Sequence, residues 1–209
     1  MKWLGILTLV FLAGCGSLDT GSDNLLGAKN INEDAAAQAR FAALARAGRP
    51  ALVVSVEDRG AIAALMLTAQ NGDVSTWVSV DNTTLSTRGG FVIATRGLGG
   101  DLMSADIAQT RQRIAGGSSG DAVRVHRYLD GEDQIIARSF VCDIRVRGPR
   151  SISIGDRRFA TRLLQERCQG SDISFQNLYW FSQSSGEMLQ SRQWVGPAVG
   201  SLAIRRILP

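Results

Sequence analysis

Alternation of apolar and polar positions dominates the chain from about residue 50 onward. The clearest case lies between Gln134 and Arg147, where Phe140, Cys142, Ile144 and Val146 alternate with Val141, Asp143, Arg145 and Arg147. A period of two is typical of a β-strand with one buried face and one solvated face. This stretch is therefore predicted to be a strand.

Further short apolar stretches follow one another at regular spacing and are also predicted strands. Turn sequences such as Asn71-Gly72-Asp73 and Asp130-Gly131 separate some of them. The connections are too short for helical crossovers, which favours antiparallel pairing of successive strands. The predicted fold is mainly β, a single antiparallel meander forming a curved sheet, a sandwich or an open barrel. The further strands are expected at 50–57, 61–70, 74–80, 84–87, 91–95, 122–129, 151–154, 157–168, 173–181, 188–195 and 202–208.

One or two short helices are expected beside this sheet. The first follows Asn32, a capping residue that precedes two acidic residues and an alanine-rich run, and it ends before Gly48 and Pro50. The second is expected at 104–115, with Ser104 as its N-cap and Gly116-Gly117 as its end.

The N-terminus has the pattern of an export signal. A basic start is followed by an apolar run at 4–13, which is too short to span a bilayer, and then by Cys15. Leu12-Ala13-Gly14-Cys15 resembles the lipobox of bacterial lipoproteins, which implies that Cys15 is acylated and becomes the mature N-terminus. The alternative is an ordinary signal peptide with an incidental cysteine. Gly16, rather than Asp, in the next position favours the periplasmic face of the outer membrane.

This pattern divides the chain into three parts. Residues 1–14 are the predicted lipoprotein signal peptide, residues 15–31 a lipidated N-terminus with a flexible tether rich in Gly, Ser, Asp and Asn, and residues 32–209 a single β-rich domain. Export into an oxidising compartment predicts a disulfide between Cys142 and Cys168, the alternative being two buried thiols. Acyl chains on Cys15 would make the membrane itself a partner.

Composition limits the possible chemistry. The 209 residues include 23 basic and 19 acidic side chains, but one histidine and three cysteines. Hydrophobic content of 44% and charged content of 20% fit a globular domain and exclude wholesale disorder. Most zinc and iron–sulfur sites need several clustered His or Cys ligands, so we expect no metal and no cofactor. The predicted location disfavours nucleic acid as a partner.

No arrangement of residues predicts catalysis. His126 lies between Arg124 and Tyr128 on the polar side of a strand, where a surface histidine is the default expectation, and no Gly-x-Ser-x-Gly elbow accompanies it. The acidic pairs Glu57-Asp58 and Glu132-Asp133 flank turns and are expected to be solvated. We therefore predict that the protein is not an enzyme, with a polysaccharide-processing enzyme that uses two carboxylates as the alternative.

Two segments are candidates for binding. The glycine-rich turn after Arg96 lacks the Lys-Ser/Thr ending of a phosphate loop, and a tight turn with positive φ is its simpler explanation. Aromatic residues near arginines suit sugar rings and acidic polysaccharide, although packing in the core also explains them. The candidate binding residues are Arg96, Gly97, Gly99, Gly100, Asp101, Tyr179, Trp180 and Trp194.

Three pieces of the sequence together resemble the YjbF/GfcB family of group 4 capsule lipoproteins. The first is the lipobox. The second contains Trp77-Val78, Asp81, Thr84-Leu85, Gly90 and the run at 95–102. The third contains Tyr179-Trp180, Ser185-Gly186-Glu187, the run at 190–194 and Gly196.

This resemblance implies a mainly β outer-membrane lipoprotein that acts in capsule or exopolysaccharide production or export. It supplies no catalytic residues. The expected partners are polysaccharide or an outer-membrane secretion protein. A lipid carrier or envelope assembly factor with an open apolar barrel remains a further alternative.

Overall fold

The computed structural model describes residues 35–208, so the predicted signal peptide, Cys15 and the tether lie outside the described residues. Twelve strands form one antiparallel sheet within this range. The elements are α2 (Ala35–Arg46), β1 (Ala51–Val56), the 3-10 turn η2 (Glu57–Arg59), β2 (Ala61–Asn71), β3 (Val74–Val78), β4 (Thr84–Arg88), β5 (Phe91–Arg96), β6 (Ser104–Asp106), α3 (Ala108–Ala115), β7 (Gly120–Leu129), β8 (Ile135–Ile154), β9 (Arg157–Gln169), β10 (Ser174–Ser182), β11 (Met188–Gly196) and β12 (Gly200–Ile207).

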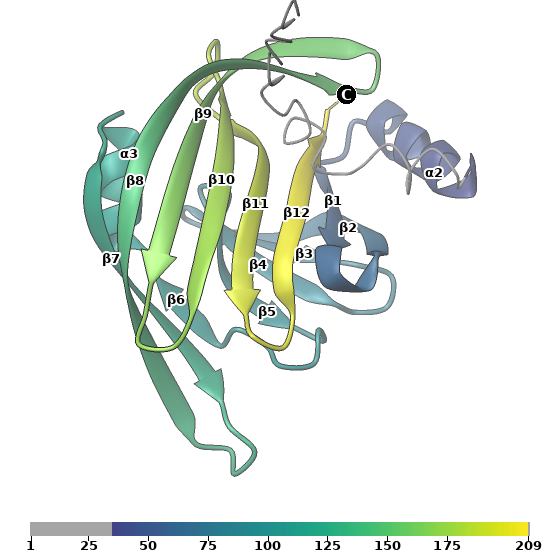
Figure 1. Cartoon of the computed structure of the whole chain (residues 1–209). Coiled ribbons are helices and arrows are strands. Elements are labelled where there is room, and N and C mark those ends of the chain that lie inside the picture. The colour runs from purple at the N-terminus through teal and green to yellow at the C-terminus, as the bar shows by residue number, and fades with distance from the viewer. Residues whose placement is uncertain (1–34, 209) are drawn as a thin grey trace, which may run out of the picture.

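The sheet is a meander that curls into a nearly closed barrel (Figure 1). The strand order is β5-β4-β3-β2-β1-β12-β11-β10-β9-β8-β7-β6, so β5 and β6 form the two ends of the sheet. The chain joins these ends, and the Thr95 N–H donates to the Leu102 carbonyl at 2.9 Å. The predicted antiparallel meander is confirmed, in the form of a barrel.

Side chains supplement the backbone pairing where the barrel closes. The Gln193 side chain, on β11, accepts from the Val92 N–H and donates to the Gly90 carbonyl, both at 2.9 Å. The Gln109 side chain, on α3, accepts from the Val123 N–H beyond the short pairing of β6 with β7. These bonds satisfy backbone groups that would otherwise be unpaired at the ends of the sheet.

Two expected boundaries were wrong. Ser104 does not cap a helix but lies in β6 opposite Arg127, and the Asp106 carboxylate instead accepts from the Ala108 N–H at 3.1 Å as α3 begins. The predicted strand at 151–154 is the distal part of β8. Gly148 and Pro149 suggest a turn, but the structure has a register shift there and the strand continues.

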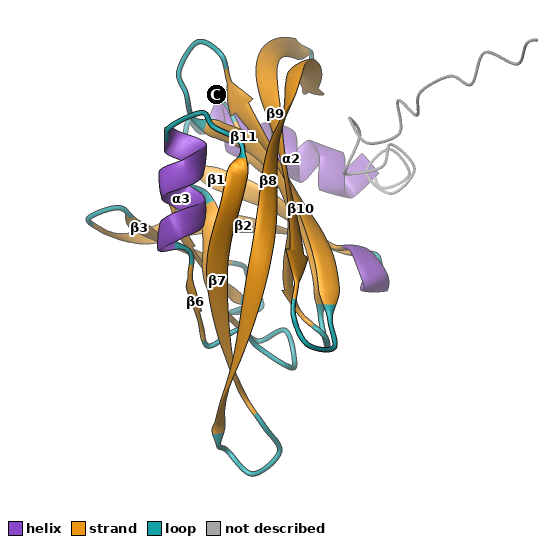
Figure 2. Cartoon of the chain, turned by 60° about the vertical axis from the view of Figure 1, so that its left-hand side comes forward, coloured by secondary structure: helices purple, strands orange, loops and turns teal. Residues whose placement is uncertain are grey.

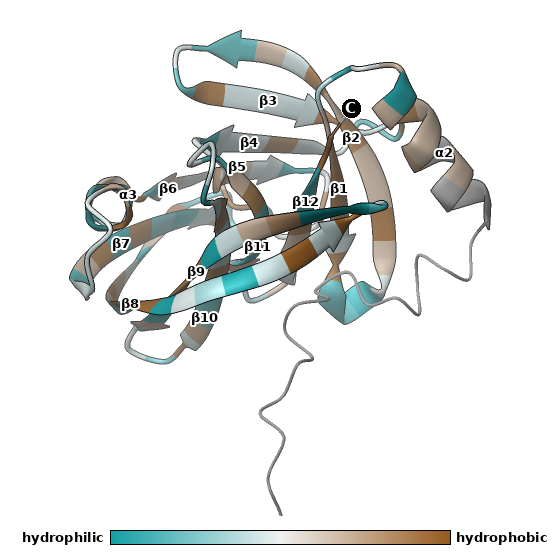
Figure 3. Cartoon of the chain, turned by 90° about the horizontal axis from the view of Figure 1, so that it is seen from above, coloured by the Kyte–Doolittle hydropathy of each residue, from teal (hydrophilic) through white to brown (hydrophobic). Residues whose placement is uncertain are grey.

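The sheet is covered on parts of both faces. The inner face holds an apolar cluster that includes Trp77, Leu85 and Leu202. On the outer face, Phe41 of α2 packs against Val53 and Ala203, and Figure 3 shows α2 outside the strands, beside β1 and β2. Figure 2 shows α3 along β7, at the end opposite the projecting β7–β8 turn. Neither helix of residues 35–208 is both long and apolar enough to cross a bilayer.

Candidate functional site

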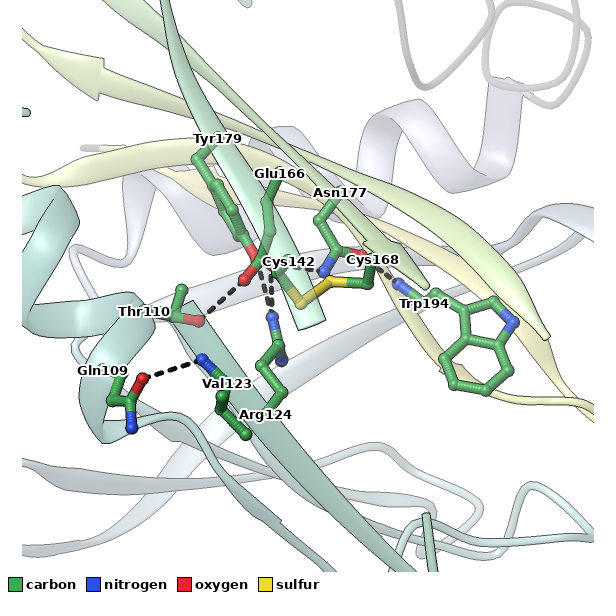
Figure 4. The surroundings of a disulfide bond; sticks show 10 residues. All are labelled: Gln109, Thr110, Val123, Arg124, Cys142, Glu166, Cys168, Asn177, Tyr179 and Trp194. Atoms are coloured by element: carbon green, nitrogen blue, oxygen red, sulfur yellow. Dashed lines mark hydrogen bonds and ion pairs between the residues drawn. A yellow bond between two sulfur atoms is a disulfide. The ribbon is translucent and has the colours of Figure 1, made fainter. Parts of the chain in front are cut away.

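A buried charged cluster lies inside the barrel (Figure 4). Arg124 of β7 and Glu166 of β9 form an ion pair of 2.6 Å, with side chains 1% and 0% exposed. The Glu166 carboxylate also accepts hydrogen bonds from Thr110 at 2.7 Å, Asn177 at 2.8 Å and Tyr179 at 2.7 Å. The cluster thereby connects α3, β7, β9 and β10.

These contacts keep both members of the pair charged. Burial alone would raise the pKa of Glu166, but Arg124 and the hydrogen bonds from Asn177, Tyr179 and Thr110 hold that pKa below its usual value. Burial disfavours charged Arg124, yet Glu166 and Tyr179 raise its pKa above the ordinary value. Glu166 is thus a fully engaged carboxylate rather than a proton donor.

His126 is fully buried, so the expectation of a surface histidine was wrong. Its ring stacks with those of Phe175 and Trp194, at centroid distances of 5.9 and 5.7 Å. Tyr128 Oη lies 3.0 Å from His126 Nδ1 and donates its own proton to the Val195 carbonyl. Because that proton is already used, Nδ1 must carry the hydrogen in the neutral ring.

The same surroundings keep His126 neutral. Burial, and secondly the positive charge of Arg124, lower its pKa to about 3. Arg124, His126 and Tyr128 of β7 therefore face the interior, while Val123 is 41% exposed on the outside. The polarity pattern predicted the opposite orientation because the buried partners of these residues lie far away in the sequence.

Cys142 and Cys168 form a disulfide between β8 and β9, which confirms the predicted pair. Their sulfurs and a Glu166 oxygen lie within 4.8 Å of one another, the spacing of a potential metal site in the described part of the chain. The disulfide uses both thiols, however, and Glu166 already has four partners. In this state the cluster does not fit a metal ion.

Arg96 is the last residue of β5, and the candidate binding residues Gly97, Gly99, Gly100 and Asp101 lie in the turn that follows it before β6. The Asp101 carboxylate accepts from the Gly97 N–H at 2.8 Å, the Leu98 N–H at 3.1 Å and the Thr95 hydroxyl at 2.9 Å. Leu98 packs against the inner apolar cluster, and its carbonyl accepts from Arg59 at 2.6 Å. This ordered turn packs against one end of the barrel.

The three aromatic candidates lie in different surroundings. Tyr179 is fully buried inside the barrel and donates to Glu166. Trp180, its neighbour on the opposite face, is equally buried in an outer cluster with Ile152, beneath the bent β8–β9 hairpin. Trp194 is half-buried and stacks on Phe175 at 4.3 Å. They do not form one surface, and their roles in binding stay predictions.

Two cavities open at the end of the barrel where the β4–β5 and β10–β11 turns lie. Their volumes are about 500 and about 1100 Å³, and both are lined by Gly89, Phe181 and Gly186. We call the two together the mouth groove. The larger cavity also reaches α3 and the Gly148-Pro149 bend of β8. Sequence reasoning missed this groove because its walls come from separate segments. Several lining residues of the smaller cavity fell within the motifs singled out, namely Trp77, Gly90, Gly186, Glu187, Gln190 and Ser191, but nothing in the sequence joined those motifs into one site.

The one-sheet antiparallel barrel and the lipobox-like N-terminus together place the protein in the class of β-rich lipoproteins. Its sequence matches the family described as "Group 4 capsule polysaccharide lipoprotein gfcB, YjbF" over residues 10–207. The chain therefore belongs to this family, as the sequence resemblance implied.

A solved structure shares the fold. The chain is similar to the hypothetical lipoprotein YmcC from Escherichia coli (K12), with a TM-score of 0.67 and 18% identity over 78% of this chain and 88% of that one. No curated protein matches the chain.

Proposed function

We propose that the protein is a non-enzymatic accessory lipoprotein in capsule or exopolysaccharide production or export. In this proposal, acylated Cys15 anchors it to the outer membrane with its barrel on the periplasmic side, and it binds the polymer or a secretion protein. The observation that carries the proposal is the family match over residues 10–207, which includes the lipobox-like segment.

Two buried titratable groups in the barrel interior, His126 and Glu166, are not placed for acid–base catalysis. His126, the one histidine of the chain, is buried and neutral. The Glu166 carboxylate is ion-paired and hydrogen-bonded on both oxygens. A general acid or base must reach the proton that it transfers, and neither group is exposed to a substrate.

Deletion and complementation in the source bacterium test the proposal. Loss of the gene is expected to reduce surface polysaccharide, and the wild-type gene to restore it. Cys15→Ser is expected to abolish labelling by palmitate, to release the protein from the membrane fraction and to restore less polysaccharide. Ser17→Ala, a change two residues away, is expected to behave as wild type.

Two outcomes would overturn the proposal. Unchanged surface polysaccharide in the deletion strain, with the neighbouring export genes expressed, would remove the role in export. Depolymerisation of purified polymer by the wild-type protein would favour the enzyme alternative.

A further inference from the structure

The mouth groove combines an aromatic floor with an arginine-rich wall. The Phe91 ring lies 4.9 Å from that of Tyr179 and 6.3 Å from that of Phe181, so apolar ring surface lies beneath the opening. Gln112 of α3 and Gln183, just after β10, add amide groups to the lining of the larger cavity. Aromatic surface beside amide groups suits the apolar faces and hydroxyl groups of sugar rings.

The charges are distributed unevenly between the two cavities. The larger cavity is lined by Arg111 and Arg162 and by no acidic residue, whereas Asp73 and Glu187 line only the smaller one. Arg111 pairs with Asp73 at 2.9 Å. Arg162 is exposed and forms no ion pair with any described residue. The larger cavity therefore presents an uncompensated positive charge, and a guanidinium can bind a carboxylate through two parallel hydrogen bonds.

The size of the larger cavity suits a piece of polymer. Small-molecule sites usually occupy about 300–1,000 Å³, and this cavity of about 1100 Å³ lies just above that range. An acyl chain would need a continuous apolar wall, but guanidinium and amide groups interrupt this one.

We propose that the mouth groove binds a short segment of an acidic polysaccharide. Arg162 pairs with a sugar carboxylate, the partly exposed Phe181, backed by the buried Phe91, contacts the ring faces, and Gln112 and Gln183 bind hydroxyl groups. This inference rests on the proposed function and specifies its ligand class and site. It places the contact at the end of the barrel that lies away from the β5–β6 turn.

Titration calorimetry with the full-length protein in detergent tests the inference. The probes are trigalacturonate and its fully methyl-esterified, neutral form, which has the same number of rings. Trigalacturonate is expected to bind more tightly than the neutral form, and its affinity to fall as salt rises. Arg162→Ala is expected to weaken its binding by about tenfold or more, because charge-assisted hydrogen bonds are lost.

Matched variants locate the site. Arg127→Ala removes the same charge from an exposed position on β7 outside the groove, and is expected to bind as wild type. Ala115→Trp keeps both groove arginines but places a large ring at an exposed position of the cavity wall, and is expected to abolish binding. Thermal unfolding verifies that each variant is folded.

Three results would overturn the inference: no binding of trigalacturonate to the wild type, equal binding of both probes, or full binding by Arg162→Ala. Full binding by Arg162→Ala with loss in Arg96→Ala would place the site at the β5–β6 turn instead. In cells, the Arg162→Ala variant could fully restore surface polysaccharide to the deletion strain. That result would overturn this inference but leave the proposed function intact. Unchanged polysaccharide after deletion would remove the proposed function itself.

Discussion

The Arg124 guanidinium and the Glu166 carboxylate meet at 2.6 Å across the interior of the barrel, although β8 separates their two strands in the sheet. Neither side chain reaches solvent. A buried pair of this kind contributes little compared with a well-packed apolar replacement, but the loss of one partner leaves the other charge buried alone. The main consequence of the pair is that β7 and β9, which are not neighbours in the sheet, depend on each other for their stability.

Glu166→Gln is expected to destabilise the fold strongly. Removing the charge leaves Arg124 without an anion in the interior, so the free energy of unfolding should fall by about 3–5 kcal/mol in urea titrations. The matched control is Arg145→Ala, which breaks an exposed ion pair with Asp143 and should cost at most about 1 kcal/mol. Equal losses in the two variants would contradict the central role of the buried pair.

The stability of the protein should fall with acidification through His126. In the folded state its pKa is lowered from 6.5 to about 3, so only the unfolded chain takes up the proton as pH drops below 6.5. The stabilisation is complete above pH 6.5 and is lost progressively as pH falls toward 3. At pH 5 the loss should be about 2 kcal/mol.

His126→Phe provides the check, since it retains an aromatic ring beside Phe175 and Trp194. The chain has no other histidine, so unfolding free energies of this variant should change much less than those of the wild type between pH 7.5 and pH 5. Parallel pH curves for the two proteins would show that His126 is accessible to protons in the folded state. The lowered pKa of Glu166 acts in the same direction at more acidic pH.

Removal of the disulfide should lower stability moderately. The bond joins residues 26 positions apart, and closing a loop of that size stabilises by about 3 kcal/mol through the unfolded chain. The double variant Cys142→Ala with Cys168→Ala should unfold at correspondingly lower urea concentration than the oxidised wild type. The wild type in reducing agent should shift in the same direction, and the double variant should not respond to that agent.

In the β5–β6 turn, the cost of a steric overlap can be separated from the cost of backbone strain. Gly99 and Gly100 both have positive φ, +70° and +100°, but a Cβ at Gly99 would meet nothing, whereas one at Gly100 would overlap Ala198. Gly99→Ala should cost about 1–2 kcal/mol through strain alone, and Gly100→Ala more. Adding Ala198→Gly to Gly100→Ala should recover the difference in urea titrations, and no recovery would exclude the clash as its cause.

Local patterns in the sequence were sufficient for most strands of the sheet but not for the orientation of their faces. The alternation around Phe140 predicted the first part of β8 correctly, because the period-two pattern is visible within the strand's own sequence. The same reasoning misplaced His126, since Arg124 owes its burial to Glu166, which is 42 residues away. Ser104 looked like a helix cap because its strand partner, Arg127, is also distant in the sequence.

The glycine-rich turn and the mouth groove also differ in whether their contacts are local in the sequence. The glycine-rich turn at 97–101 was visible as a motif because its hydrogen bonds are local, with Asp101 accepting from Gly97 and Leu98. The mouth groove has no such signature. Arg111, Arg162 and Phe181 come from three separate elements, and only the curvature of the sheet brings them to one opening.

The pairing of β1 with β12 has a consequence for how the chain reaches its final form. Every other neighbouring pair in the sheet joins strands that are consecutive in the chain, so most hairpins can assemble as soon as their residues are present. The first strand, by contrast, must wait for the last one with an exposed edge, which is prone to pairing with other chains. Newly made molecules therefore pass through a stage that is open to aggregation, and the final eight-residue strand brings that stage to an end.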